Sequence, residues 1–592
     1  MAKKAIILHD EPAGQQEVLL SYILDFFAVP WEFVEVRQMA SRVSSITDTV
    51  AFGSARVVAA LLREGRECAA PAAFYVYANN EDCAGAVQFL IGDTQVSLKR
   101  ATEGKTSLSV SGSMAKLTGP MTGLAVSTDL SREDAIVANI PAGRTIEFVP
   151  IISCDGGPVF LWFDREGVPV YLCASSHVVN IDQPLTGGHY DVKTHFCSAV
   201  PLVMFIKFMF PEVAWRPQEL GACLIIDDPL LRLRYGFCDF PKLRDLMRQH
   251  GFTTNIAFIP WNWRRTSDSD AGFFREESRY FSVSVHGCDH TAREFGATSA
   301  EVLHSAARLA QCRMRNHETR TGIQHDRVMV FPQGVFSSSC PDILKQSGFL
   351  ASVNTEIIPV DSHNARTHIR DVWDVAIMTY GDFPIFTRRY PWHGLENFAF
   401  DLLLGKPCLI VTHQDFFKDA GKQLIQLIED LNSLKCSLNW DALRDVIRKA
   451  CRKRPTGPGA EEVEMYGSEL VIGNPSDLPI VAKVRKRKGK SADIARVLCD
   501  GQPVMWEIEG DYLVFSQRIL PHRETCCRVE YLELGTGGMA HRSLKFEASV
   551  AARRMLSEFR DNYISQTPLL NAPMKKLRKV VKGKFWVEGW KS

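Results

Sequence analysis

The chain has 592 residues, which is too long for one hydrophobic core and predicts three or four domains. Hydrophobic residues make up 46% of the sequence and charged residues 23%, a composition typical of soluble globular proteins. The formal net charge of +1 provides no general attraction for nucleic acid, so we expect no nucleic-acid partner.

Three features bear on the cellular compartment. The apolar run in the opening "MAKKAIILHD" is too short for a secretory signal. The 16 cysteines contain no C-x-x-C pair and suit reduced thiols. The longest apolar window, 199–215, carries Lys207 and two prolines, so we expect a buried or interfacial helix there and no transmembrane segment. Together these features predict a cytoplasmic protein.

The N-terminal region, 1–195, opens with a strand, a helix and a second strand over 4–36. This order predicts an α/β domain, whose role the sequence does not specify. No glycine-rich phosphate-binding motif follows the first strand, so a nucleotide site is not supported. Further along, 157–173 is typical of a hairpin that turns at 165–167.

The central region, 196–455, contains seven short apolar runs, most of them separated by helical patterns. This alternation predicts a parallel sheet or barrel. A helix with one apolar face is expected at 422–434, packed on that body. The seven runs are 222–226, 255–259, 281–285, 328–331, 350–353, 375–378 and 408–411.

A basic and then Pro/Gly-rich segment, 448–460, marks a domain boundary. Alternating apolar residues after it predict a small β-sandwich over 461–540, followed by an amphipathic helix and a basic tail over 541–592. The basic runs 484–490 and 575–586 suit anionic head groups or acidic glycans. We interpret them first as a solvated loop and a solvated tail, with membrane-surface contact through the tail as the alternative.

Chemically active side chains follow several of the central runs. In parallel α/β folds such side chains lie at the carboxyl ends of strands. The first run ends in Asp227 and Asp228, the third in His286 and His290, and the last in His413. One carboxylate and two imidazoles can hold a divalent metal, with zinc as the first choice, and leave a position open for water. A second carboxylate can act as general base, and a separate histidine can protonate a leaving group.

Each feature alone also has an ordinary structural interpretation. Paired aspartates often form a turn or a helix cap, and two histidines four residues apart are common by chance. Trp261 and Trp263 follow the second run and could simply pack, but flat rings also suit the faces of sugars. On an extended segment both indoles would point away from Asn262. The combination, in this order at strand ends, favours a catalytic site.

The order of these motifs resembles the polysaccharide deacetylase family, carbohydrate esterase family four, over about residues 218–435. The resemblance is carried by "LIIDDP", "HGCDH", "VFPQG" and "CLIVTH". It implies a seven-stranded distorted β/α barrel that removes acetyl groups from sugars with a divalent metal and metal-activated water. It further implies Asp227 as the base, Asp228, His286 and His290 as metal ligands, His413 as the acid, and Pro332 and Gln333 on the groove wall.

The sequence departs from the family pattern at three places. Pro229 follows the paired aspartates where the family usually has glycine. Val330 and Phe331 occupy the positions of the third motif where the family usually has an arginine that orients the base. The fourth motif is only loosely similar to 371–374.

The resemblance implies a metal-dependent deacetylase acting on an acetylated sugar. Two alternatives stay open: a metal-dependent hydrolase of a glycosidic or non-acetyl amide bond, and a non-catalytic glycan-binding or assembly protein. The last predicts broken ligand motifs, whereas Asp228, His286 and His290 are all present. The absence of a recognisable signal favours a nucleotide-linked, lipid-linked or other intracellular sugar as the substrate. The sequence does not specify an oligomeric state.

Overall fold

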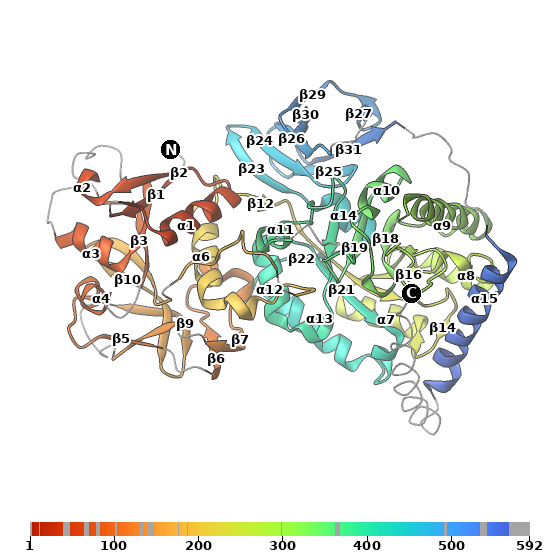
Figure 1. Cartoon of the computed structure of the whole chain (residues 1–592), viewed down its shortest axis with the longest axis horizontal. Coiled ribbons are helices and arrows are strands. Elements are labelled where there is room, and N and C mark those ends of the chain that lie inside the picture. The colour runs from red at the N-terminus through yellow and green to blue at the C-terminus, as the bar shows by residue number, and fades with distance from the viewer. Residues whose placement is uncertain are drawn as a thin grey trace.

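A computed structural model of the chain shows three layered parts, with the N-terminal sheet, the central barrel and the C-terminal sandwich side by side (Figure 1). It describes residues 3–10, 12–39, 48–63, 70–78, 83–100, 104–130, 134–139, 147–175, 177–185, 187–297, 299–361, 367–489, 494–532 and 542–566. The predicted multidomain α/β fold with a central barrel and a C-terminal sandwich is confirmed.

The N-terminal part is a mixed sheet of nine strands that begins as predicted. Helix α1 (Gln15–Phe26) connects the parallel strands β1 (Lys4–His9) and β2 (Trp31–Glu35). The predicted hairpin is formed by β10 (Gly157–Arg165) and β11 (Val168–Cys173), with Glu166 and Gly167 at φ of 55° and 86°, as a tight two-residue turn requires. The other strands of this sheet are β3 (Thr49–Ser54), β4 (Ala73–Tyr77), β6 (Gly104–Val110), β7 (Ala125–Leu130) and β9 (Phe148–Cys154).

Helix α6 (Phe196–Met209) lies between the N-terminal sheet and the barrel. The segment 192–209 is long and apolar enough to cross a membrane by composition alone, but 72% of it is buried inside the protein. Phe205 on this helix packs on Phe52 and Tyr75 of the N-terminal sheet, with ring centroids 5.5 and 5.0 Å away. The predicted apolar helix is therefore a core helix that joins two parts of the protein.

The central sheet is a nearly closed barrel of seven parallel strands in the order β20-β19-β18-β17-β16-β13-β21. Arg389, just after β20, closes the ring: its backbone N–H donates to Leu409 and its carbonyl accepts from Val411, both at 2.9 Å. The carboxyl ends of all seven strands therefore share one rim. The strands are β13 (Leu220–Asp227), β16 (Thr254–Phe258), β17 (Phe281–His286), β18 (Val328–Val330), β19 (Ala351–Asn354), β20 (Ile385–Thr387) and β21 (Cys408–His413).

The predicted strand at 375–378 is wrong, and β20 takes its place in the barrel. The segment 375–378 is buried but irregular, and Ile377 makes only an isolated bridge to Ile385. The buried ammonium of Lys406 donates to the carbonyls of Val372 and Asp374. A side chain, and not a neighbouring strand, therefore provides the hydrogen bonds for the backbone just before 375–378. An apolar run reports burial, and burial alone does not distinguish a strand from a packed loop.

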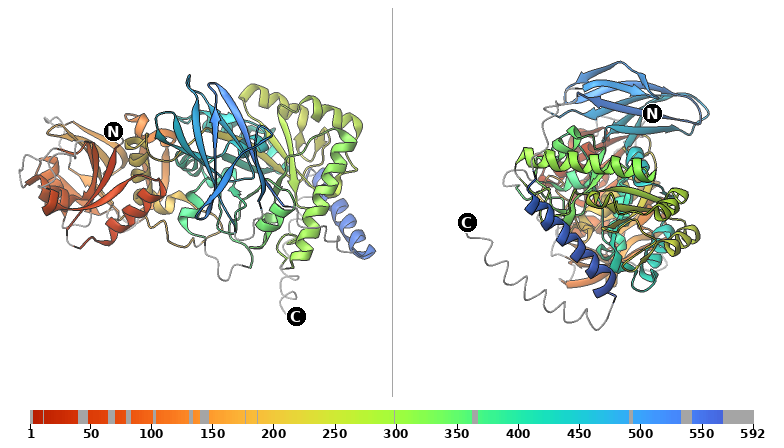
Figure 2. Two further views of the ribbon diagram at one scale, coloured as in Figure 1. Left: turned by 90° about the horizontal axis from the view of Figure 1, so that it is seen from above. Right: turned by 90° about the vertical axis from the view of Figure 1, so that its right-hand side faces the viewer.

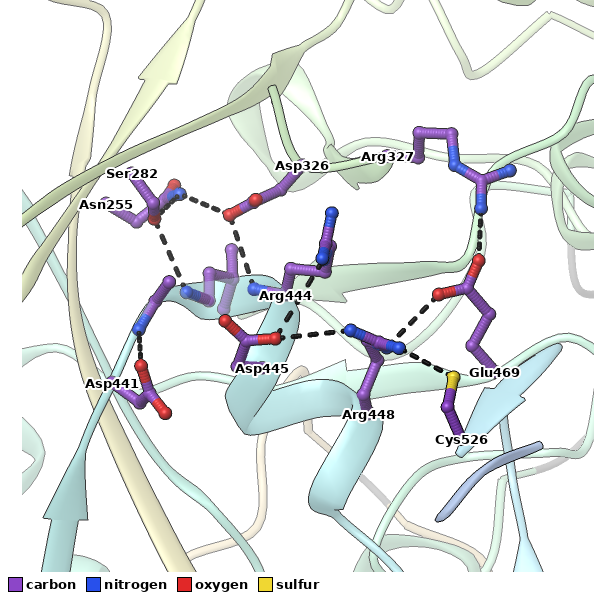
Figure 3. Close-up of polar contacts among 12 residues, drawn as sticks. Asn255, Ser282, Asp326, Arg327, Asp441, Arg444, Asp445, Arg448, Glu469 and Cys526 are labelled. Carbon is purple, nitrogen blue, oxygen red and sulfur yellow. Dashed lines mark hydrogen bonds and ion pairs between the residues drawn. The ribbon is translucent and has the colours of Figure 1, made fainter. Parts of the chain in front are cut away.

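The opposite end of the barrel is closed by α14 (Leu443–Lys449), which also contacts the sandwich (Figure 3). The buried carboxylate of Asp326 accepts hydrogen bonds from Asn255 and from the backbone of Arg444, each at 3.3 Å. Further along α14, Arg448 pairs with Glu469 of the sandwich at 3.1 Å. These polar contacts join the two parts at the end of the barrel that carries no predicted catalytic group.

The C-terminal sandwich is built from two sheets, as predicted. One has the order β12-β23-β24-β26-β30-β29 and the other β25-β31-β27-β28. The basic run 484–490 lies largely within β26 (Ile480–Arg487), so the interpretation as a solvated loop is wrong there. Arg485 pairs with Glu462 and Glu464, and the buried ammonium of Lys486 donates to the Tyr466 carbonyl at 2.6 Å. The remaining strands are β12 (Arg216–Pro217), β23 (Arg452–Gly457), β24 (Ala460–Met465), β25 (Glu469–Asn474), β27 (Ile494–Cys499), β28 (Gln502–Pro503), β29 (Trp506–Glu509), β30 (Tyr512–Ile519) and β31 (Arg523–Tyr531).

After the sandwich, the chain returns to the barrel. Helix α15 (Leu544–Phe559) and a π-helical turn (Arg560–Ile564) lie across the outside of the barrel (Figure 2). The amphipathic helix predicted for this region is confirmed. The basic tail at 575–586 lies outside the described residues.

Candidate active site

Two adjacent aspartates end β13 at the rim of the barrel. Asp227 is the last residue of the strand and is buried. Asp228 has a left-handed backbone with φ of 83°, and its N–H donates to the Ala257 carbonyl at 3.3 Å. Consecutive strand residues normally point to opposite faces, and the left-handed turn at Asp228 breaks that alternation. Both carboxylates can therefore serve the same rim.

Asp228 meets the two predicted histidine ligands. Its Oδ1 atom lies 3.4 Å from His286 Nε2 and 3.1 Å from His290 Nε2, and the three ligand atoms lie within 4.8 Å of one another. His286 Nδ1 lies 3.0 Å from the carbonyl of Val330, to which it can donate, and this leaves the Nε2 lone pair facing Asp228. The structure thus brings these three side chains together, while metal binding by them stays a prediction.

The electrostatics of this cluster fit a cation. Asp228 Oδ1 is buried and has no hydrogen-bond partner among the residues that the structure describes. Burial raises the pKa of the Asp228 carboxyl, but His290 and His286 outweigh burial and hold that pKa well below its ordinary value. Positive charge facing the carboxylate causes this lowering, and a cation bound by the imidazole lone pairs would supply that charge in the same place. One oxygen and two nitrogen donors make a set that divalent metals can bind.

The loop that carries the histidines is held by Glu294. Its carboxylate accepts backbone hydrogen bonds from Cys288 at 3.0 Å, Asp289 at 2.8 Å and His290 at 3.2 Å. His290 has φ of 56°, a conformation that such bonds help to maintain. The second histidine is therefore positioned by a half-buried carboxylate that accepts from its backbone N–H.

Glycine is required inside the same loop. Gly287 has φ of 63°, and a Cβ atom there would lie 2.4 Å from Cγ of Pro332 and 2.6 Å from a carboxylate oxygen of Glu294. Pro332 is buried against this loop, whereas Gln333 is exposed and has a left-handed φ of 59°. Of these two residues, Pro332 packs against the histidine loop and Gln333 faces solvent.

Asp227 forms an ion pair with an arginine that the sequence analysis missed. Arg388 donates to its two carboxylate oxygens at 2.7 and 2.8 Å, and both side chains are buried. Burial raises the pKa of the Asp227 carboxyl, but Arg388, His286 and His413 together outweigh burial and hold the pKa below its ordinary value. Asp227 is therefore ionised and fixed in orientation, as a general base requires. Arg388 thus orients Asp227 from a different place in the chain than Val330 and Phe331, where the family pattern has its arginine.

His413 ends β21 and is the neighbour of Asp227 across the sheet, since the two residues are partners in the β13–β21 register. Its ring is half-buried and lies 6.3 Å from the ring of Tyr390. The His413 imidazole also lowers the pKa of Asp227. The predicted base and acid therefore share the rim with the histidine cluster.

Comparison with known proteins gives distant structural similarity only. No family model and no curated protein sequence matches the chain. Among solved structures, Agd3, described as a novel carbohydrate deacetylase, aligns with 89% of this chain and 98% of its own, at 10% identity and a TM-score of 0.45. The chain resembles carbohydrate esterase family four. A family 4 carbohydrate esterase from Streptomyces lividans, in complex with acetate, aligns with 36% of this chain and 85% of its own, at 15% identity and a TM-score of 0.21. A family 4 acetyl xylan esterase from Clostridium thermocellum, with a cobalt ion, aligns with 38% and 89%, at 10% identity and a TM-score of 0.23.

Of the two predicted groove tryptophans, Trp261 lies next to the histidine loop, and the segment that carries it is not extended. Pro260–Asn262 form a 3₁₀ turn, which corrects the premise of strand-like alternation. Asn262 is nevertheless buried, and Trp261 and Trp263 are both half-buried. The backbone N–H of Trp261 donates to the Cys288 carbonyl at 3.0 Å. Trp261 therefore lies beside the loop that connects the two histidines.

A second aromatic surface, also missed from the sequence, lies on the other side of the rim. Trp392 is 67% exposed and stacks on Tyr390, with ring centroids 4.3 Å apart and an interplanar angle of 9°. Tyr390 in turn lies beside His413. An exposed indole that is stacked on a tyrosine near His413 is well suited to contact a sugar ring. Both Arg388 and this aromatic pair follow β20, the strand that the sequence analysis misplaced.

Proposed function

We propose that the protein is a metal-dependent hydrolase that removes an acetyl group from an acetylated sugar. The observation that carries the proposal is the meeting of two units at one barrel rim. One unit is the cluster of Asp228, His286 and His290, and the other is Asp227, held by Arg388, with His413 beside it. This arrangement combines a cation site with an ionised base and a separate acid.

Each residue has a distinct task in this proposal. Asp228, His286 and His290 would hold the divalent ion, with zinc as the first candidate. When bound, such an ion polarises a carbonyl and lowers the pKa of water. Asp227 accepts a proton from the attacking water, and Arg388 keeps its carboxylate ionised and oriented. His413 donates a proton to the departing sugar oxygen or nitrogen.

Aromatic side chains would bind the sugar on both sides of this site. Trp261 lies beside the histidine loop, where Gln333 is exposed next to Pro332, and Trp392 lies on the side of His413. Trp263, two residues after Trp261, is proposed for the same groove. Flat apolar faces of pyranose rings pack well on such indoles. We propose an intracellular acetylated sugar or glycan precursor as the substrate class.

Metal analysis followed by an acetate-release screen tests the proposal. Elemental analysis should show close to one divalent ion per chain in the wild type and loss of that ion in His286→Ala and His290→Ala. Asp227→Asn should keep the ion and lose turnover on the order of a hundredfold, because the amide cannot accept the proton. Equal metal content in the wild type and both histidine variants would refute the ligand assignment. Retention of full acetate release by Asp227→Asn would refute the assignment of the base.

A further inference from the structure

Helix α15 is docked on the barrel by its polar face. Glu558 pairs with Arg232 at 3.0 Å and also with Arg265, and Asp561 accepts a hydrogen bond from Tyr235 at 2.9 Å. Arg554, on the same face, is 5% exposed. Arg232, Tyr235 and Arg265 all follow strands of the barrel at their carboxyl ends. The polar face of an amphipathic helix usually faces solvent, but in α15 it is the polar face that packs on the barrel.

The opposite face of α15 is apolar and open to solvent. Its large side chains are among the most exposed of their kind in the part of the chain that the structure describes. Along the helix they recur at spacings that place them on one stripe. The stripe consists of Leu544 (89% exposed), Met555 (61%), Leu556 (69%), Phe559 (53%) and Tyr563 (62%).

Charge is divided between the two faces in the same way. The acids of this segment, Glu547, Glu558 and Asp561, all form ion pairs on or near the barrel side. The exposed charges beside the apolar stripe are basic, Lys545 and Arg553. The sequence then continues over 567–592 with seven lysines or arginines, one glutamate, Phe585, Trp586 and Trp590.

We propose that the exposed stripe of α15 docks on an anionic lipid bilayer. An amphipathic helix that has apolar residues on one face and basic residues along its edge lies in the interface of a membrane, with the apolar side chains between the lipids. Lys545 and Arg553 beside the stripe add attraction to anionic head groups. This proposal does not depend on the catalytic one, since it uses only the outward face.

A second copy of the chain is the competing occupant of this stripe, and the observations favour lipid. A stable protein interface needs about 800 Å² from each partner, and one helix stripe offers a narrower surface. Two copies meeting through α15 would also bring Lys545 and Arg553 of one close to those of the other. Like charges across an interface oppose association, whereas anionic head groups would neutralise them.

Vesicle co-sedimentation of the full chain tests the docking. The wild type should bind phosphatidylcholine vesicles that contain phosphatidylserine, and bind pure phosphatidylcholine vesicles weakly. The double variant Leu556→Glu/Phe559→Glu should lose at least tenfold in the partition coefficient while its thermal midpoint stays close to that of the wild type, because both side chains are exposed. Met505→Glu is the matched control, because Met505 is 90% exposed on the sandwich, and its binding should be unchanged.

Two further measurements keep the outcome decisive. In Phe559→Trp, fluorescence from the new indole should shift to shorter wavelength when anionic vesicles are added, relative to the parent protein. Light scattering should show the same oligomeric state for the wild type and the Leu556→Glu/Phe559→Glu variant. Unchanged vesicle binding in that double variant would overturn the proposal, and so would a wild-type dimer that the variant converts to a monomer without any vesicle binding.

Discussion

Replacing Arg388 with methionine tests the central feature of the proposed site. The Arg388–Asp227 pair is bidentate and buried, so the substitution leaves a carboxylate without its partner in a site that excludes water. Breaking a buried ion pair by removing one member costs about 3–5 kcal/mol. The released carboxylate also loses the contacts that fix its direction, and turnover should therefore fall on the order of a hundredfold.

The neighbouring residue offers a matched control. Arg389 is also buried and bidentate, donating to Asp401 at 2.6 and 3.0 Å, but this pair lies outside the catalytic cluster. Arg389→Met should therefore lose a similar amount of stability, about 3–5 kcal/mol, while turnover per folded molecule stays close to that of the wild type. Comparing the two variants separates the loss of a buried pair from the loss of the oriented base.

Urea unfolding and acetate release, measured on the same samples, give the two quantities. Acetate release is normalised to the folded fraction, and metal content is recorded for each variant. If Arg388→Met and Arg389→Met lose equal activity per folded molecule, Arg388 acts only in stability and the reasoning about the base fails. Asp227→Asn combined with Arg388→Met should recover part of the stability but none of the turnover, because no buried charge is left unpaired.

Three further predictions follow from other residues. Trp261→Ala and Trp263→Ala should raise KM or lower kcat, while the thermal midpoint stays close to that of the wild type. A loss of about 3–5 kcal/mol of stability with unchanged activity per folded molecule would show that these side chains only pack in the core. Burial raises the pKa of Asp326 to about 7. The folded state therefore holds that proton more tightly than the unfolded state. The free energy of unfolding should fall by up to about 4 kcal/mol as the pH rises from 4 to 7. Urea titrations at several pH values should show this fall in the wild type and its loss in Asp326→Asn. Gly287→Ala should lose the metal by elemental analysis, because its Cβ would lie 2.4 Å from Pro332, whereas Gly251→Ala, at a similar φ but with nothing within 4 Å, should keep it.

Much of the barrel could be predicted because its strands are short apolar runs bounded by polar residues. Six of the seven runs are strands in the structure, and the rule that chemistry follows strand ends located Asp227, Asp228, His286 and His413. The rule needs correct strands, however. The apolar pattern predicts the sixth strand at 375–378, so the rule points away from the residues that follow the real strand, Ile385–Thr387, and misses Arg388.

Contacts between segments far apart in the sequence were also beyond prediction from local patterns. The helical period predicts an amphipathic helix near α15, but period alone does not say which face is buried. Glu558 lies 326 residues from Arg232, with which it pairs, and that pairing decides the orientation. Ion pairs with Arg232 and Arg265, together with the Tyr235–Asp561 hydrogen bond, hold the polar face against the barrel and leave the apolar side chains exposed.

The backbone at the rim gives an independent reason to regard the cluster as functional. Asp228, His290 and Gln333 all have positive φ, at 83°, 56° and 59°. A residue other than glycine in this region is strained, typically by about 1–3 kcal/mol, and persists only where its surroundings hold it. Glycine would adopt the same backbone without that strain, as Gly287 does between the two histidines. The side chains of Asp228 and His290 therefore contribute something other than stability, and both of them point at the same few ångströms of space as His286. Strain at both Asp228 and His290 is the cost we would expect if a carboxylate and two imidazoles are brought together to hold one cation.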